Sequence, residues 1–165
     1  MKKEVFIRPA KPDEGALLSQ LAFASKAMYG YTEAFMEACR SELTWSESDL
    51  RDETYRFLVA ESDGKLRGFA ALLLDQEGSA ELEALFVDPA SAGKGIGSTL
   101  LTGVVKVACA LGIRAVTIQR DPGAVPFYER FGAQKVGESP SGSIEGRMLP
   151  VLVLDLSHPL LLPIS

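Results

Sequence analysis

Three glycines at alternate positions, Gly93, Gly95 and Gly97, follow a strand-like apolar run. A stretch with apolar residues at helical spacing begins at Ser98, so the pattern predicts a strand, a glycine-rich turn and the N-terminus of a helix. Glycine lets the backbone approach a ligand closely, and the first helical turn presents unpaired N–H groups with a partial positive charge. The segment therefore predicts a phosphate site, with Lys94 as a nearby cation.

The spacing of this loop separates it from two common phosphate-binding motifs. A P-loop requires Ser or Thr directly after its lysine, whereas Gly95 follows Lys94 here. A dinucleotide-binding fingerprint would require glycine at the position of Ser98. A tight connection between strand and helix, without any ligand, is the alternative that the pattern alone leaves open.

The composition limits the classes of protein to which such a loop can belong. With 165 residues, 47% of them hydrophobic and 24% charged, the chain is expected to form one globular domain with its own core. A net charge of −5 argues against binding to nucleic acid. Cys39, Cys109 and the single histidine, His158, form no metal-ligand pattern, so we expect no metal site and no structural disulfide.

The hydrophobic segments are too short to direct the chain to a membrane. Only three apolar residues precede Arg8 and Pro9 after the basic start, which does not fit a signal peptide. The longest apolar runs, 69–74 and 149–154, are far shorter than the ~20 residues that span a bilayer. We therefore expect a cytoplasmic protein in a reducing compartment, without membrane contacts.

Hydrophobic periodicity predicts an α+β fold. Runs of β-branched and aromatic residues predict about seven strands, and apolar residues at helical spacing predict four helices. In chain order these are a strand at 4–8, helices at 13–30 and 32–43, strands at 55–61, 66–74 and 80–87, a helix at 98–112, a strand at 113–118, a helix at 124–131, and strands at 134–138 and 149–156. We expect a mixed, mostly antiparallel central sheet between helices in three layers, as one domain over 1–156 with a tail over 157–165.

Two segments resemble motifs of the GCN5-related N-acetyltransferase (GNAT) family. Val87-Asp88-Pro89 together with Gly93-Lys94-Gly95-Ile96-Gly97 resembles its acetyl-CoA pyrophosphate motif, and Pro126-Phe127-Tyr128-Glu129-Arg130-Phe131-Gly132-Ala133 resembles its second cofactor motif. The order of the predicted elements agrees with this family over nearly the whole chain. Two positions depart from the pattern: Ala92 stands where the family usually has Gln or Arg, and Pro122-Gly123-Ala124 stands where Asn is often found.

The resemblance implies acetyl-CoA as co-substrate and assigns the residues that would bind it. The backbone at the end of the strand at 80–87 would bind the pantetheine arm, and the glycine loop would hold the pyrophosphate. The strand at 113–118 would splay away to open a cleft for the thioester. The implied cofactor-binding residues are Leu85, Phe86, Val87, Ala92, Gly93, Lys94, Gly95, Ile96, Gly97, Ser98, Ala124, Phe127 and Tyr128.

The resemblance also implies roles in catalysis. Tyr128 would be the general acid that protonates the thiolate of CoA as it leaves. Glu81 or Glu83, which alternate onto one face of a strand, would accept the proton of the attacking amine, directly or through water, with Glu81 ranked first. The alternative for the two glutamates is a solvated strand face, and for Tyr128 it is an ordinary aromatic on an amphipathic helix.

The residues of the acceptor pocket are predicted from their position in the chain. Tyr29 and Tyr31 lie between the first two predicted helices, where this family commonly builds the pocket. Arg147 lies in a polar excursion before the last strand and is a candidate partner for a carboxylate of the acceptor. Core packing is the alternative for the tyrosines, and a surface position is the alternative for the arginine.

The expected function is the transfer of an acetyl group to a primary amine of a small molecule or a peptide. The amine would attack the thioester directly in a ternary complex, and a homodimer is a further expectation from the resemblance. A non-catalytic acyl-CoA-binding or sensing domain is the alternative, because Ala92 lacks the usual side chain. A regulator that binds another phosphate ligand through the same loop is a third.

Overall fold

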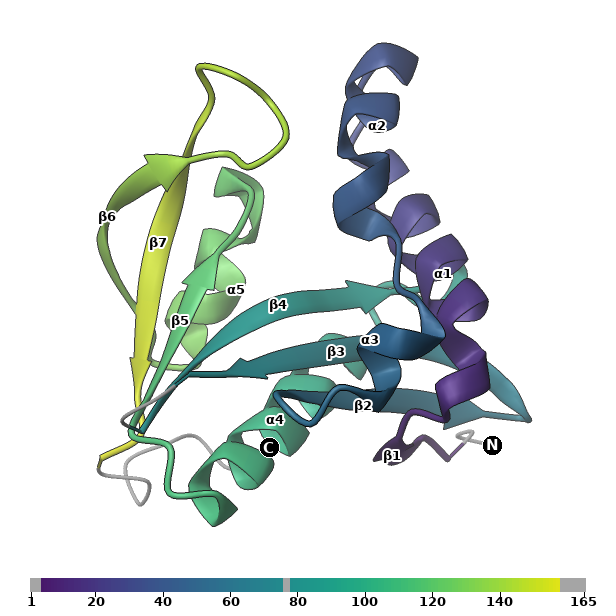
Figure 1. Ribbon diagram of the computed structural model, residues 1–165, viewed down its shortest axis with the longest axis vertical. Helices are drawn as coiled ribbons and strands as arrows, with labels where there is room; N and C mark the ends of the chain where they lie inside the picture. Colours follow the sequence, from purple (N-terminus) through teal and green to yellow (C-terminus); the bar gives the residue numbers. More distant parts are fainter. Residues whose placement is uncertain (1–3, 76–77, 158–165) are drawn as a thin grey trace.

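A central sheet of seven strands divides the molecule into two helical layers (Figure 1). The computed structural model describes residues 4–75 and 78–157, so His158 and the rest of the predicted tail lie outside the described residues. The order across the sheet is β1-β2-β3-β4-β5-β7-β6, and each neighbouring pair is antiparallel except β4 and β5. The predicted mixed, mostly antiparallel sheet is therefore confirmed.

The predicted strands and helices are all present, with shifted ends. The strands are β1 (Phe6–Pro9), β2 (Tyr55–Ser62), β3 (Lys65–Leu74), β4 (Ser79–Val87), β5 (Ala115–Gln119), β6 (Gln134–Pro140) and β7 (Met148–Asp155), and the helices are α1 (Gly15–Ala27), α2 (Glu33–Cys39), α3 (Glu47–Arg51), α4 (Ile96–Ala110) and α5 (Val125–Arg130). The short helix α3 was not predicted. Its signal is a capping box, in which Ser46 and Asp49 accept each other's backbone N–H groups.

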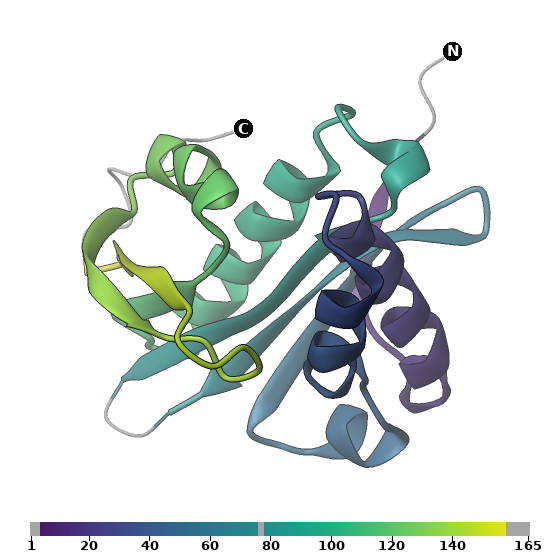
Figure 2. The ribbon, with the colours of Figure 1, turned by 90° about the horizontal axis from the view of Figure 1, so that it is seen from above.

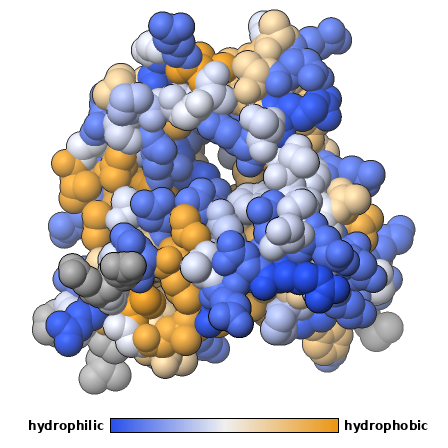
Figure 3. All heavy atoms as spheres, in the orientation of Figure 1, coloured by the Kyte–Doolittle hydropathy of each residue, from blue (hydrophilic) through white to orange (hydrophobic). Residues whose placement is uncertain are grey.

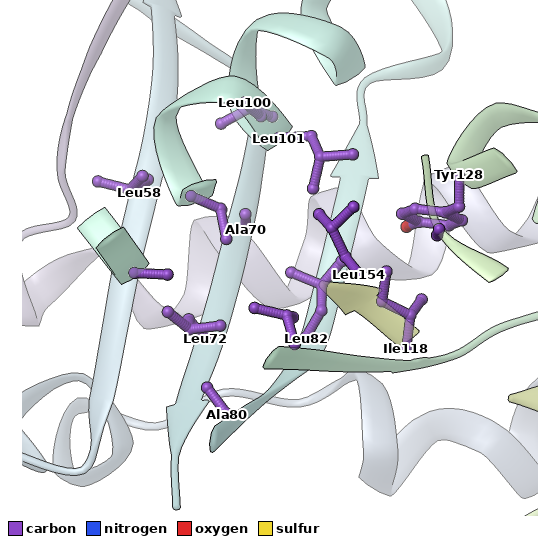
Figure 4. Close-up of a cluster of buried hydrophobic side chains, with 14 of the residues drawn as sticks. Leu58, Ala70, Leu72, Ala80, Leu82, Leu100, Leu101, Ile118, Tyr128 and Leu154 are labelled. Carbon is purple, nitrogen blue, oxygen red and sulfur yellow. The ribbon is translucent and has the colours of Figure 1, made fainter. Parts of the chain in front are cut away.

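Helices cover both faces of the sheet (Figure 2), and a hydrophobic core lies on each face. On one face, Leu100 and Leu101 of α4 belong to the same buried cluster as Leu72 of β3 and Leu82 of β4 (Figure 4). On the other face, α1 and α2 cover a second cluster, in which the Trp45 ring lies edge-on to aromatic side chains of the sheet. Because the central strands are buried on both faces, they read as continuous apolar runs in the sequence.

A β-bulge in β4 separates the sheet into two halves. Leu72 of β3 pairs with Leu82, whereas Ala71 pairs with Ala84, so Glu83 is an extra residue in β4. An extra residue bends a strand and increases its twist. The ladder between β4 and β5 ends at the pair Leu82–Ile118, and β4 continues to Val87 without a partner on that side. The expected splay between these strands is therefore present, and the bulge explains it.

The first strand is anchored by an ion pair between Arg8 and Glu14. The two terminal nitrogens of Arg8 donate to the two carboxylate oxygens of Glu14, each at 2.9 Å, and the backbone N–H of Lys11 donates to one of them at 2.7 Å. The hydrogen bonds from Arg8 are the main cause that holds the pKa of Glu14 below its usual value. This pair ties β1 to the start of α1.

We expect Glu14→Gln to lower the free energy of unfolding at neutral pH by about 2 kcal/mol, because the guanidinium of Arg8 loses its two charged hydrogen bonds to Glu14 and keeps that of Nε to Glu61 at 3.2 Å. A carboxyl whose pKa is depressed by folding stabilises the fold fully above the pKa of a free glutamate, about 4.3, and loses this contribution as the pH falls through its folded-state pKa. The difference between the two proteins should therefore shrink in acid.

Urea unfolding of both proteins at neutral pH and at about pH 3 measures this difference. The acidic value lies below the pKa of a free glutamate. Glu47→Gln is the matched control, because Glu47 and Arg51 form an exposed pair at 3.6 Å that should contribute little. An equal loss of stability for Glu14→Gln at both pH values would contradict the assigned role of the ion pair.

Candidate functional site

The glycine-rich loop leads into the N-terminus of α4 in an open conformation. Gly93 and Gly95 each have a φ of 78°, in the left-handed region that favours glycine. A Cβ added at either position would meet no atom within 4 Å. The loop therefore needs glycine for its backbone conformation, and the space beside it is free. The first N–H groups of α4 have no acceptor within the helix, as a phosphate site requires.

The structure shows which atoms of the predicted loop residues can contact a cofactor. Ala92 and Lys94 are exposed beside the glycines. Ser98 lies in the first turn of α4 and is partly exposed. Ile96 is 4% exposed and packs against Gly68 of β3, so only its backbone N–H is available to a phosphate.

In the predicted pantetheine segment at the end of β4, the side chains are likewise packed in the fold and the backbone is available to a ligand. The side chains of Leu85 and Val87 pack on the α4 face, and the ring of Phe86 lies on the opposite face, 5.7 Å from the ring of Phe69. The backbone edge toward β5 is not used by the sheet beyond Leu82. A pantetheine arm can therefore pair with this edge as an added strand.

Helix α5 brings the second predicted motif beside the glycine loop. The ring of Phe127 would lie 3.5 Å from a Cβ at Gly97, and Ala124 ends the 3-10 turn that precedes α5. Tyr128 is 2% exposed, lies edge-on to Phe127 and reaches the α4-side core with its oxygen turned toward the labelled leucines (Figure 4). Burial raises the pKa of Tyr128, and the guanidinium of Arg120 opposes this rise.

A cavity of about 720 Å³ lies on the other face of the split, between the two halves of the molecule. The space-filling view shows a hollow there with mostly hydrophilic surface around it (Figure 3). Glu81 and Glu83, two residues apart in β4, both lie in its wall, as the alternation of side chains along a strand predicts. The charged residues that line the cavity are Lys26, Glu42, Asp49, Glu81, Glu83, Arg120 and Asp121.

Glu83 is the half-buried carboxyl of this cavity. Burial is the main cause that raises the pKa of Glu83 above its usual value, and the charge and hydrogen bond of Glu81 act in the same direction. Arg120 lowers the pKa of Glu83, and Glu42 raises it. A carboxyl with a raised pKa is a better proton acceptor for an ammonium group than an ordinary surface carboxyl.

A bridge of four side chains, Lys26, Tyr31, Asp121 and Arg147, connects the two halves over the cavity. Arg147 Nη2 lies 3.1 Å from Asp121 Oδ1 and donates to the Tyr31 hydroxyl at 3.1 Å, and Lys26 Nζ lies 3.6 Å from Asp121 Oδ2. The ring of Tyr31 stacks on Phe35 at 4.1 Å. These contacts join α1 and α2 to the segments that flank β5 and β7.

The bridge changes the interpretation of two predicted acceptor residues. Arg147 was predicted as a partner for a carboxylate of the acceptor, but its guanidinium binds the carboxylate of Asp121 in the structure. A direct contact between Arg147 and an acceptor stays a prediction. Tyr29 is 58% exposed, with its ring 6.2 Å from that of Tyr31, and neither tyrosine lines the cavity itself, so their part in an acceptor pocket stays a prediction.

Sequence reasoning missed Lys26, Asp121 and Arg120. Arg120 and Asp121 follow closely after the predicted strand at 113–118, and charged residues at the end of a strand that borders a cleft are the signal that was available.

Within residues 4–75 and 78–157, no helix is long and apolar enough to cross a bilayer. The same residues contain no group of three or more acidic, histidine or cysteine side chains arranged for a metal ion.

Comparison with known proteins identifies the family of this fold. A profile of the Acetyltransferase (GNAT) family matches residues 21–133, more than half of the chain, so the protein belongs to that family. Membership confirms the resemblance drawn from the two motifs. It supports the predicted enzyme class, an acyltransferase that depends on acetyl-CoA.

Individual relatives agree with this assignment. An uncharacterized N-acetyltransferase of Methanocaldococcus jannaschii, MJ1207, is 34% identical over 94 residues, which cover 52% of this chain and only 41% of that relative. The structure resembles the PaiA N-acetyltransferase of Thermoplasma acidophilum in complex with coenzyme A, with a TM-score of 0.76 and 25% identity over 92% of this chain and 99% of that one. A GCN5-related N-acetyltransferase of Rhodopseudomonas palustris has the same fold, with a TM-score of 0.76 and 24% identity over 94% and 99%.

We expect Glu83→Gln to raise the free energy of unfolding at neutral and alkaline pH, because the folded protein no longer holds a charge in a half-buried site. A carboxyl whose pKa is raised by folding destabilises the fold fully above its folded-state pKa and not at all well below the pKa of a free glutamate. The advantage of the variant should therefore appear as the pH rises through that range.

Thermal melting of both proteins from acid to mildly alkaline pH measures this advantage. Glu138→Gln on the exposed strand β6 is the control, because this carboxylate is well solvated and forms an exposed pair with Lys135 at 3.4 Å. If Glu83→Gln melts like the control at every pH, Glu83 is part of a solvated strand face.

We expect Gly95→Ala to weaken the binding of coenzyme A at least about tenfold, because the methyl group disfavours the left-handed backbone that directs the loop N–H groups outward. Gly64→Ala is the matched control. Gly64 has a φ of 72° in the turn between β2 and β3 and equally open space around it, so both variants carry similar strain, about 1–2 kcal/mol. Calorimetry with coenzyme A compares them, and equal affinities would contradict the assignment of the loop.

Proposed function

We propose that the protein transfers the acetyl group of acetyl-CoA to a primary amine, by direct attack in a ternary complex. The observation that carries this proposal is the split between β4 and β5, because it connects two different surfaces. The α4 face of the split carries the glycine loop with Phe127 and Tyr128, and the other face carries a cavity lined by carboxylates. A thioester in the split is reachable from both.

The cofactor would lie on the α4 face. Backbone N–H groups from Gly93 to Ser98 would bind the pyrophosphate, with Lys94 as an additional cation, and the free edge of residues 85–87 would bind the pantetheine arm. A backbone N–H of this edge would also polarise the thioester carbonyl. The complex of PaiA with coenzyme A supports this choice of ligand, because its fold matches over 92% of this chain.

The amine would enter from the cavity. An amine is mostly protonated at neutral pH and must lose a proton before its nitrogen attacks the thioester carbonyl. The half-buried Glu83, with its raised pKa, is better suited to take this proton than a solvated carboxylate, so we place it ahead of Glu81. Tyr128 would then protonate the sulfur as the C–S bond breaks.

The cavity also favours a cationic acceptor of limited width. Five carboxylates and two cations line it, and the charge of Asp121 is already balanced by Lys26 and Arg147. Two members of the bridge, Lys26 and Asp121, line the cavity, and Tyr29 and Tyr31 would contact the acceptor beside them. A small amine, or the end of a peptide, fits these limits. A cytoplasmic location, inferred from the sequence, and a homodimer, inferred from the family resemblance, remain part of the proposal.

A panel of acceptors tests the proposed activity. Release of free thiol from acetyl-CoA is followed with aliphatic monoamines, diamines, amino acids and short peptides. We expect turnover above hydrolysis for cationic amines and little for amines that carry a carboxylate. Binding of coenzyme A without turnover for any amine would instead support an acyl-CoA sensor, and tight binding of ATP without coenzyme A would support the nucleotide-binding alternative.

We expect Tyr128→Phe to lower kcat for the best acceptor about 10²-fold, the lower range for loss of a positioned acid, while KM for acetyl-CoA changes little. The phenyl ring keeps the packing against Phe127, so the cofactor surface should stay intact. Steady-state kinetics give both constants, and melting temperature with coenzyme A affinity provides the folding control. A kcat within about threefold of the original would remove Tyr128 from the mechanism.

A further inference from the structure

Arg120 occupies the apex of the split between β4 and β5. It follows the last residue of β5, and the final pair between the two strands is Leu82–Ile118. Its Nη2 donates to the backbone oxygen of Leu82 at 3.3 Å, and its Nη1 donates to the backbone oxygen of Gln119 at 3.3 Å. The side chain therefore supplies to β4 a donor that the backbone ladder no longer provides.

The same guanidinium lies between the two surfaces that the split connects. It lines the acceptor cavity together with Glu81 and Glu83, and it lies 5.8 Å from the ring centre of Phe86. On the α4 face, its charge opposes the rise that burial causes in the pKa of Tyr128. Arg120 thus acts in the same direction on the pKa of the proposed acid and on that of the proposed base.

One donor of Arg120 has no use in the fold. In the described part of the chain, Nε is buried and has no hydrogen-bond partner. A buried and unsatisfied N–H group costs free energy, about 1–3 kcal/mol, and more when it belongs to a charged side chain. A neutral side chain such as glutamine can donate to the backbone oxygen of Leu82 without that cost, so capping of the strand alone does not explain an arginine here.

We propose that Arg120 is a positioning residue for acetyl transfer, whose charge at the apex of the split serves Glu83 on one face and Tyr128 on the other. This inference rests on the proposed function and adds the residue that couples its two proton transfers.

The proton balance of the reaction explains why one fixed cation suits both partners. Before attack, Glu83 is ionised and Tyr128 is neutral. Glu83 then takes a proton from the ammonium, the C–N bond forms, the C–S bond breaks, and Tyr128 gives its proton to the sulfur. Negative charge has moved from the cavity face to the cofactor face, and Arg120 faces both positions. The remaining amide proton restores Tyr128, Glu83 releases its proton to solvent, and the net products are amide, thiol and one proton.

The other groups around these two residues cannot replace Arg120. Glu83 is faced by Glu81 on its own strand, by Glu42 and by Tyr55 of β2, and none of these is a cation. Tyr128 is faced by Tyr29 in addition to Arg120. Arg120 is the group that lowers the pKa of both residues, against the effect of burial.

Two variants separate charge from capping. Arg120→Gln keeps a donor for Leu82 and removes the charge, whereas Arg120→Lys keeps the charge and removes the planar guanidinium. We expect Arg120→Gln to lower kcat about 10²-fold with KM for acetyl-CoA within about threefold, and to move the acidic limb of the pH profile to higher pH, because the pKa of Glu83 rises. Arg120→Lys should retain at least about a tenth of kcat, and the acidic limb of its pH profile should stay at the pH of the wild-type protein.

A titration without turnover gives an independent readout. The side-chain carboxyl signal of Glu83, assigned by its absence in Glu83→Gln, is followed by carbon NMR in protein labelled at glutamate. We expect its midpoint to rise in Arg120→Gln and to stay in place in Arg120→Lys. If the wild-type protein acetylates no amine, the proposed function fails, and this titration still decides whether Arg120 acts on Glu83.

Several outcomes would overturn the proposal. The first is an Arg120→Gln protein whose kcat and acidic limb match those of the wild-type protein. The second is an equal loss of kcat in Arg120→Gln and Arg120→Lys without a shift of the acidic limb. The third is an unchanged titration midpoint of Glu83 in Arg120→Gln. Melting temperature and coenzyme A affinity control for folding. Should Arg120→Gln not fold, a shifted limb in a folded Arg120→Lys that binds coenzyme A normally would overturn it, because charge alone would then be insufficient.

Discussion

The extra residue in β4 is the constraint on which the rest of the site depends. A regular ladder would continue to pair β4 with β5 and would leave no free backbone edge on either strand. Because Glu83 is inserted opposite β3, β4 bends, the pairing stops at Leu82, and the edge of residues 85–87 becomes available. Glu81 and Glu83 line the cavity beside this edge. One backbone irregularity thus frees the proposed cofactor edge next to the proposed acceptor wall.

The two faces of the split use different sources of charge. On the cofactor face, positive potential comes from the N–H groups of a helix end, which need no neutralising partner and no titratable group. On the acceptor face, negative potential comes from side chains such as Glu83. The net charge of −5 fits this division, because an acidic surface would attract the proposed cationic amines while the backbone dipoles would still bind the phosphates.

The parts of this site that were predictable are local in the sequence. The glycine loop, α4 and the strand before it follow from residue types within the single stretch 80–112. The bulge at Glu83 depends instead on the register with β3, and the bridge joins Tyr31 to Arg147 across 116 positions. Neither the bulge nor the bridge leaves a periodic pattern in the amino-acid sequence. Arg120 was missed for a related reason, since the need for a side-chain donor arises only where the ladder ends.

The charges at the split also indicate a balance between stability and activity. A glutamine in place of Glu83, or a neutral donor in place of Arg120, would cost the fold less free energy. Each of the two residues holds a charge in a partly or fully desolvated place. The two charges reduce each other's cost, but neither is required to hold the sheet together. Their presence where β4 and β5 separate, and not along the regular ladder, is what proton transfer to and from a thioester in the split would require.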